Sequence, residues 1–114
     1  MASIVLFHSA LGLTTGTRKF AETLIRDGHI VLTPDLFDGE TFRAVEDGVK
    51  KRDAVGIPEL IRRAAKSVEA APLASIYAGF SMGAAAAQFL AATRPGARGA
   101  VLMHAVLPLA AMGM

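Results

Sequence analysis

The chain has 114 residues, 53% of them hydrophobic and 19% charged, and twelve Lys and Arg residues against ten Asp and Glu leave a formal charge of +2. This composition, with a mean hydropathy of +0.44, is typical of one globular domain and excludes a disordered chain, and the near balance of charge gives no indication of nucleic-acid binding. There is no cysteine, which excludes disulfide bonds, thiolate metal sites and a cysteine nucleophile.

The beginning of the chain predicts a strand followed by a helix. Residues 3–7 form a short apolar run, typical of a strand buried on both faces, and it ends in the small-residue loop 8–12. A helix is expected over residues 17–27, with Thr17 as its N-cap and Gly28 as the left-handed residue that follows it.

The middle of the chain predicts a second strand and a second helix. Residues 30–33 are expected to form a buried strand, and a long polar loop that contains Gly39 and Gly48 follows. Apolar residues recur with helical spacing from Ile57 to Val68, which predicts an amphipathic helix.

The end of the chain repeats the alternation. Residues 73–80 predict a third strand, residues 82–93 a third helix and residues 100–103 a fourth strand. The third helix has almost no polar face, so we expect it to be covered nearly all round. Four strands alternating with three helices are the pattern of an α/β fold, a doubly wound parallel sheet with ligands bound beyond the carboxyl ends of its strands.

The motif Gly-Phe-Ser-Met-Gly, residues 79–83, stands where the third strand gives way to the third helix. A nucleophilic serine at such a junction sits in a very tight turn, so the residues two before and two after it tolerate little beyond hydrogen. The helix that begins at Met82 also directs its free N–H groups toward the space beside Ser81. The alternative is a turn that uses glycine for packing and Ser81 as a helix cap.

The run "VLFHSALGLTTGTRKFAETLIRDGHIVLTPDLFDG" followed by "YAGFSMGAAAA" resembles the dienelactone hydrolase family of the α/β-hydrolase fold over nearly all of the chain. The resemblance implies a cytoplasmic, cofactor-free hydrolase of small esters or lactones. It also implies that Ser81 is the nucleophile and that the backbone N–H groups of Ala10 and Met82 form the oxyanion hole. The founding members of the family carry cysteine in place of Ser81 and glutamate in place of Ser9.

Other side chains are candidates for the surroundings of such a site. His8, Leu11 and His104 are candidates for lining the pocket, and for His8 the sequence favours the alternative interpretation, a ring that positions the loop by hydrogen bonding to its backbone. His29 is expected at the opposite end of the sheet. Asp35 and Asp38 are expected to cap or order their loop. No group of residues has metal-ligand spacing.

The order of a hydrolase triad places the acid and the base after the serine. Only an almost wholly apolar segment follows the fourth strand, so the sequence predicts a single truncated domain, residues 1–114, that corresponds to the N-terminal half of a hydrolase. Two functions stay open at this point. One is a serine hydrolase, and the other is a non-catalytic fragment or interaction module whose sheet edge is covered by the missing half, another chain or a second copy.

The N-terminus has no basic segment followed by a long apolar run, which favours a cytoplasmic protein. The longest apolar tract is shorter than the ~18 residues that a membrane span requires, so no membrane partner is expected. The partner that the sequence predicts is a small-molecule substrate.

Overall fold

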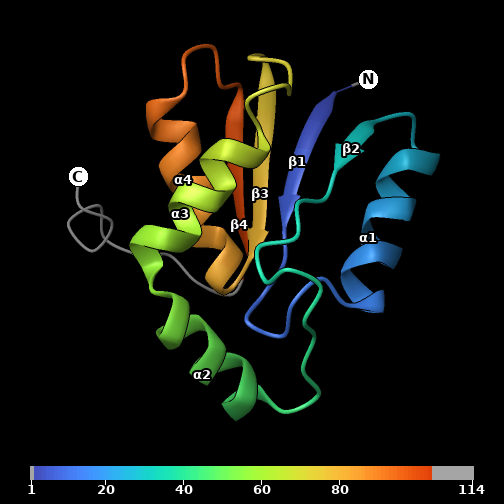
Figure 1. Ribbon diagram of the computed structural model, residues 1–114. Helices are drawn as coiled ribbons and strands as arrows, with labels where there is room; N and C mark the ends of the chain where they lie inside the picture. The colour runs from blue at the N-terminus through green and yellow to red at the C-terminus, as the bar shows by residue number, and fades with distance from the viewer. Residues whose placement is uncertain (1, 104–114) are drawn as a thin grey trace.

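The structure is a computed structural model and describes residues 2–103 (Figure 1). Its elements in chain order are β1 (Ser3–Phe7), α1 (Thr15–Arg26), β2 (Ile30–Leu32), α2 (Val45–Val55), α3 (Ile57–Ser67), β3 (Ser75–Phe80), α4 (Met82–Thr93) and β4 (Gly99–Met103). All strand pairs are parallel and the sheet order is β2-β1-β3-β4. The predicted doubly wound parallel α/β fold is therefore confirmed, with one helix more than expected.

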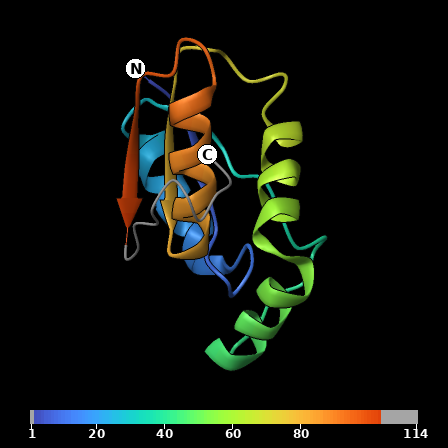
Figure 2. The ribbon, with the colours of Figure 1, turned by 90° about the vertical axis from the view of Figure 1, so that its left-hand side faces the viewer.

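The two faces of the sheet carry different helices. On β1, Val5 and Phe7 pack in a cluster with side chains of α3 and α4, whereas Ile4 and Leu6 pack against α1. Figure 2 shows α4 between the sheet and α3. This arrangement follows from the alternation of side chains along a strand, because a strand buried on both faces needs a helix on each side.

Helix α4 lies at the centre of the α3 side, in contact with β1, β3, β4 and α3. Most of its side chains are buried, including the run of alanines from Ala84 to Ala87. The expectation of a helix covered nearly all round is confirmed, since small side chains let the sheet and α3 approach it closely.

Strand β2 differs from the prediction of a buried strand. It has only three residues and lies at the edge of the sheet, with Ile30 57% exposed. An apolar run of this length looks the same in the sequence whether the strand is central or at an edge, because only the sheet order decides how much of it is covered.

Helix α1 begins earlier than predicted. The side chain of Thr14, not that of Thr17, caps the helix by accepting a hydrogen bond from the Thr17 backbone N–H at 3.4 Å. Gly28 has φ +93° and so takes the expected left-handed conformation after the helix. Phe20 and Ile25 of this helix remain partly exposed, because α1 covers only part of the sheet.

Helix α2 was not predicted, because its residues were assigned to a polar loop. It has no apolar stripe, Val45 at its start is 63% exposed, and its buried residue is Gly48, a poor helix former. The helix lies beyond the carboxyl ends of the strands (Figure 1). Among residues 2–103, no helix combines the length and apolarity needed to cross a membrane.

Candidate functional site

Ser81 joins β3 to α4 in a strained backbone conformation. Its φ of 52° and ψ of −110° place a non-glycine residue at positive φ, a conformation found mostly where tertiary contacts enforce it. The Ser81 N–H donates to the carbonyl of Met103 at 2.7 Å, and the Ser81 carbonyl accepts from the Ala84 N–H at 2.9 Å. The turn is therefore fixed on one side to β4 and on the other to the first turn of α4.

The two glycines of the motif are required by close contacts. A Cβ on Gly79 would overlap the carbonyl oxygen of Gly83 and lie 2.6 Å from the nitrogen of Ala84. A Cβ on Gly83 would lie 2.5 Å from the carbonyl oxygens of both Phe7 and His8. The sequence predicted the first contact, across the turn itself. The second shows that Gly83 also seats the turn against the end of β1.

The strand order reverses between β1 and β3, because β2 lies outside β1 and β4 lies outside β3. The predicted pairing of β1 with β3 is confirmed, with Phe7 opposite Gly79. The loop that follows β1 and the turn that follows β3 therefore meet at the reversal point, where open α/β sheets bind their ligands.

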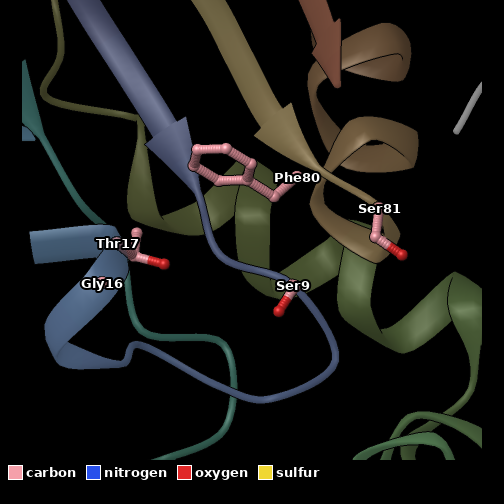
Figure 3. Close-up of a pocket in the computed structure, with 5 residues that line it drawn as sticks. All are labelled: Ser9, Gly16, Thr17, Phe80 and Ser81. Carbon is pink, nitrogen blue, oxygen red and sulfur yellow. The ribbon is translucent and has the colours of Figure 1, made fainter. Parts of the chain in front are cut away.

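A cleft of about 310 Å³ opens at this point and is lined by Ser9, Gly16, Thr17, Phe80 and Ser81. Figure 3 shows Ser9 on the loop after β1, between Ser81 at one side and Thr17 near the start of α1 at the other. Reasoning from sequence identified Ser81 but not the other residues of this lining. Phe80 could have been found from the alternation of side chains along β3. Tyr77 packs on the α4 side, so Phe80, three residues later, lies on the α1 side.

His8 does not line this cleft, which corrects one expectation, because its side chain is completely buried. The Leu36 N–H donates to Nε2 of His8 at 2.8 Å, and Nδ1 lies 2.7 Å from the carbonyl oxygen of Ser9. This pattern requires a neutral ring with its proton on Nδ1. Burial lowers the pKa of His8, and it outweighs the Ser9 carbonyl and the Asp35 carboxylate, which raise that pKa. His8 thus connects two loops, as its alternative interpretation predicted.

Asp35 orders the loop that follows β2, as predicted. Its two carboxylate oxygens accept from the N–H groups of Phe37 at 2.9 Å and Gly39 at 3.0 Å. Asp38 is exposed and lies 3.6 Å from the guanidinium of Arg63. Neither carboxylate lines the cleft beside Ser81.

Ala10 and Met82, the residues expected to supply the oxyanion hole, are both buried. Within residues 2–103, neither backbone N–H donates a hydrogen bond. Met82 is the first residue of α4, so its N–H lies at the positive end of the helix dipole. The Ala10 N–H belongs to a tight loop closed by a 3.0 Å hydrogen bond from the Gly12 N–H to the Ser9 carbonyl.

The remaining candidates lie away from the cleft or outside the described residues. Leu11 is not among the residues that line it, and its N–H donates to the Ser9 hydroxyl at 3.2 Å. His29 accepts from the Ala2 N–H at the opposite end of the sheet, as expected. His104 lies outside the described residues. In the part of the chain from residue 2 to 103, no group of three His, Cys, Asp or Glu side chains is placed to hold a metal.

Comparison with known proteins gives one match. A model of the dienelactone hydrolase family matches residues 1–112. No curated protein and no solved structure matches the chain. The matched range includes both the loop after β1 and the turn at Ser81, which are the two segments that meet at the cleft.

Proposed function

Because the chain belongs to the dienelactone hydrolase family, we propose that it hydrolyses carboxylic esters or lactones with Ser81 as the nucleophile. Membership of this family indicates a hydrolase. The observation that carries the finer proposal is the backbone of Ser81, held at positive φ between β3 and α4 and open to a cleft. Strain of this kind is found where a side chain must be presented in one direction.

In the proposed reaction, the Ser81 hydroxyl oxygen attacks the carbonyl carbon of the substrate and its proton passes to a general base. The carbonyl oxygen becomes negatively charged and accepts hydrogen bonds from the N–H groups of Ala10 and Met82. Collapse of this intermediate breaks the ester bond, the protonated base gives its proton to the departing alcohol oxygen, and the acyl group stays on Ser81. In a lactone, the released hydroxyl stays attached to that acyl group. Water then hydrolyses the acyl-enzyme to the free acid.

We place the general base outside residues 2–103. Both ring nitrogens of His8 are engaged by backbone groups, and His29 lies at the far end of the sheet. Burial also lowers the pKa of His8, so its ring is a poor acceptor of a proton. The described residues therefore supply the nucleophile and the oxyanion donors of the proposed site, and the base belongs to another segment.

The described part of the cleft favours a small acyl group. Its volume of about 310 Å³ lies at the lower end of the range for small-molecule sites. Phe80 offers an apolar wall, and the hydroxyls of Ser9 and Thr17 offer polar contacts. A short-chain ester or small lactone fits this combination better than a long fatty acyl chain.

A fluorophosphonate probe tests the nucleophile directly, because each serine hydroxyl that reacts stays covalently modified, so that even a slow reaction accumulates an adduct during a long incubation. We expect mass spectrometry of the digested protein to find the adduct on the peptide that contains Ser81. The Ser81→Ala variant should lose the adduct. Ser67→Ala should retain it, because the Ser67 hydroxyl donates to the Ala64 carbonyl within α3, away from the cleft. An adduct that persists in Ser81→Ala would refute the assignment.

Turnover of an activated aryl ester by the 114-residue chain should be very slow. An oxyanion hole without its base leaves only a residual acceleration of roughly 10³ to 10⁴ over water. The rate of Ser81→Ala gives the background that does not depend on the proposed nucleophile. Fast turnover that Ser81→Ala abolishes would contradict the expectation of a truncated hydrolase that lacks its base.

A second candidate function, an interaction module, is favoured by an apolar groove on the α1 side of the sheet. The groove has a volume of about 210 Å³ and includes Val101 of β4, which is 51% exposed. In this alternative a second protein chain covers the groove. Absence of labelling at Ser81, together with concentration-dependent association that Val101→Glu abolishes, would favour it over the hydrolase.

A further inference from the structure

Helix α2 packs on the loop after β1 through its backbone at a glycine, whereas the other helices pack through apolar side chains. Its buried residue is Gly48, not an apolar side chain. A Cβ on Gly48 would overlap the carbonyl oxygen of Ala10 and lie 2.8 Å from its carbonyl carbon. The backbone of α2 therefore rests directly on the Ala10–Leu11 peptide, in the loop after β1.

The same face of α2 makes a second connection to this loop. Lys51, one helical turn after Gly48, forms an ion pair with Glu40. The backbone of Glu40 in turn presses on Gly12, because a Cβ there would overlap the Glu40 carbonyl oxygen. Nearby, the Phe42 N–H donates to the Leu11 carbonyl at 2.9 Å. The loop 9–12 is thus enclosed by α2 and by the segment 40–42.

This contact and the proposed oxyanion donor belong to the same residue, Ala10. The Ala10 carbonyl that Gly48 touches and the Ala10 N–H share one Cα, so a displacement of the carbonyl changes the position of the N–H. Donors act on a developing oxyanion only within about 2.7–3.1 Å, and misplacement by ~1 Å can cost a large part of the rate.

From these contacts, and resting on the function proposed above, we propose that Gly48 is a positioning residue that sets the place of the Ala10 N–H in the oxyanion hole. The absence of a side chain at Gly48 lets α2 act as a support behind the loop. The ion pair between Lys51 and Glu40 keeps α2 in that position.

The test compares Gly48→Ala with Lys50→Ala, a control on the exposed side of α2. Fluorophosphonate labelling of Ser81 is resolved into its binding constant KI and its maximal rate kinact. An oxyanion donor acts in the transition state, so Gly48→Ala should lower kinact about 10- to 100-fold with KI within about twofold, somewhat less than the ~10²- to 10³-fold cost of losing a whole donor. Lys50→Ala should leave both constants unchanged.

A spectroscopic readout and a milder variant accompany the kinetics. The amide resonances of Ala10 and Leu11 should shift in Gly48→Ala but not in Lys50→Ala. Lys51→Ala should lower kinact a few-fold, and Lys51→Arg should restore it because the ion pair with Glu40 is kept. These variants decide the question even if Gly48→Ala does not fold.

The possible outcomes separate this inference from the proposed function. Absence of wild-type labelling at Ser81 would overturn both. Normal labelling of the wild type with an unchanged kinact in Gly48→Ala and Lys51→Ala would overturn the positioning role of Gly48 alone. A fall in kinact with the expected shift of the Ala10 resonance would support both.

Discussion

The two backbone segments that meet at the cleft are held in different ways. The turn at Ser81 has its sequence signature within five residues, in the close approach of Gly79 and Gly83, although contacts with β4 and with the end of β1 hold it in place. The loop after β1 has hydrogen bonds of its own but no comparable sequence motif, and it is enclosed by distant segments through His8, Glu40 and Gly48. A local motif can therefore identify one side of the site, whereas the other side depends on the whole fold.

The largest expected effect is at the turn. Gly83→Ala would place a Cβ 2.5 Å from the carbonyl oxygens of Phe7, the last residue of β1, and of His8, which follows it, so the end of the strand would have to move. We expect a loss of roughly 3 kcal/mol or more in the free energy of unfolding, measured by urea denaturation, together with loss of labelling at Ser81. A variant with nearly wild-type stability would show that the turn is not fixed by this contact.

A smaller effect is expected at Gly12, in the loop after β1. Gly28, which follows α1, is a matched control that separates the cost of a positive φ from the cost of a steric clash. Gly12 and Gly28 have almost the same φ, +91° and +93°, but only at Gly12 would a Cβ meet backbone atoms. Gly28→Ala should cost about 1 kcal/mol from backbone strain alone, and Gly12→Ala about 2–3 kcal/mol. Equal costs in urea denaturation would mean that the segment 40–42 does not press on the loop.

The smallest effect is a dependence on pH that comes from His8. Burial holds the pKa of His8 below its ordinary value of 6.5, so the unfolded chain binds a proton more readily than the folded one. The free energy of unfolding should therefore have its full value above pH 6.5. It should fall as the pH is lowered below 6.5, by at most about 1.4 kcal/mol for each pH unit. Denaturation series at several pH values would measure this slope.

His8→Gln is the control for the pH series, and it should be nearly flat between pH 7 and 5. Glu59 does not contribute in this window. Hydrogen bonds from Arg62, with further help from Arg63, lower the pKa of Glu59 to about 2, so its stabilisation is lost only as the pH falls below the ordinary value of 4.5 toward 2. A wild-type protein whose stability does not change above pH 5 would contradict the buried, neutral state of His8.

The sequence predicted the features that repeat along the chain or lie within one short motif. The order of strands and helices, the covered helix α4 and the two glycines around Ser81 follow from apolar periodicity and local sterics. The roles of Ser81, Ala10 and Met82 came from the motif and the family resemblance, and they stay predictions.

What the sequence did not predict depends on contacts between distant segments. Helix α2 has no apolar stripe, and a glycine at position 48 is more typical of a loop than of a helix. Gly48 is accommodated in α2 because the helix backbone packs directly on Ala10. The exposure of β2 depends on its place at the edge of the sheet. The expectation that His8 lines the pocket was wrong, because the burial of its ring depends on the loop after β2.

The pairing of β1 with β3 also determines when the site forms during folding. The hydroxyls of Ser3 and Ser75, which lie 3.0 Å apart at the start of these strands, are separated by 72 residues of chain. Pairings between such distant segments form slowly, because a long loop must close before the contact contributes any stability. Gly83 packs against the carbonyl oxygens of Phe7 and His8 at the end of β1, so the turn at Ser81 is completed only after this pairing. We expect the reactivity of Ser81 to return later in refolding than the helical circular-dichroism signal.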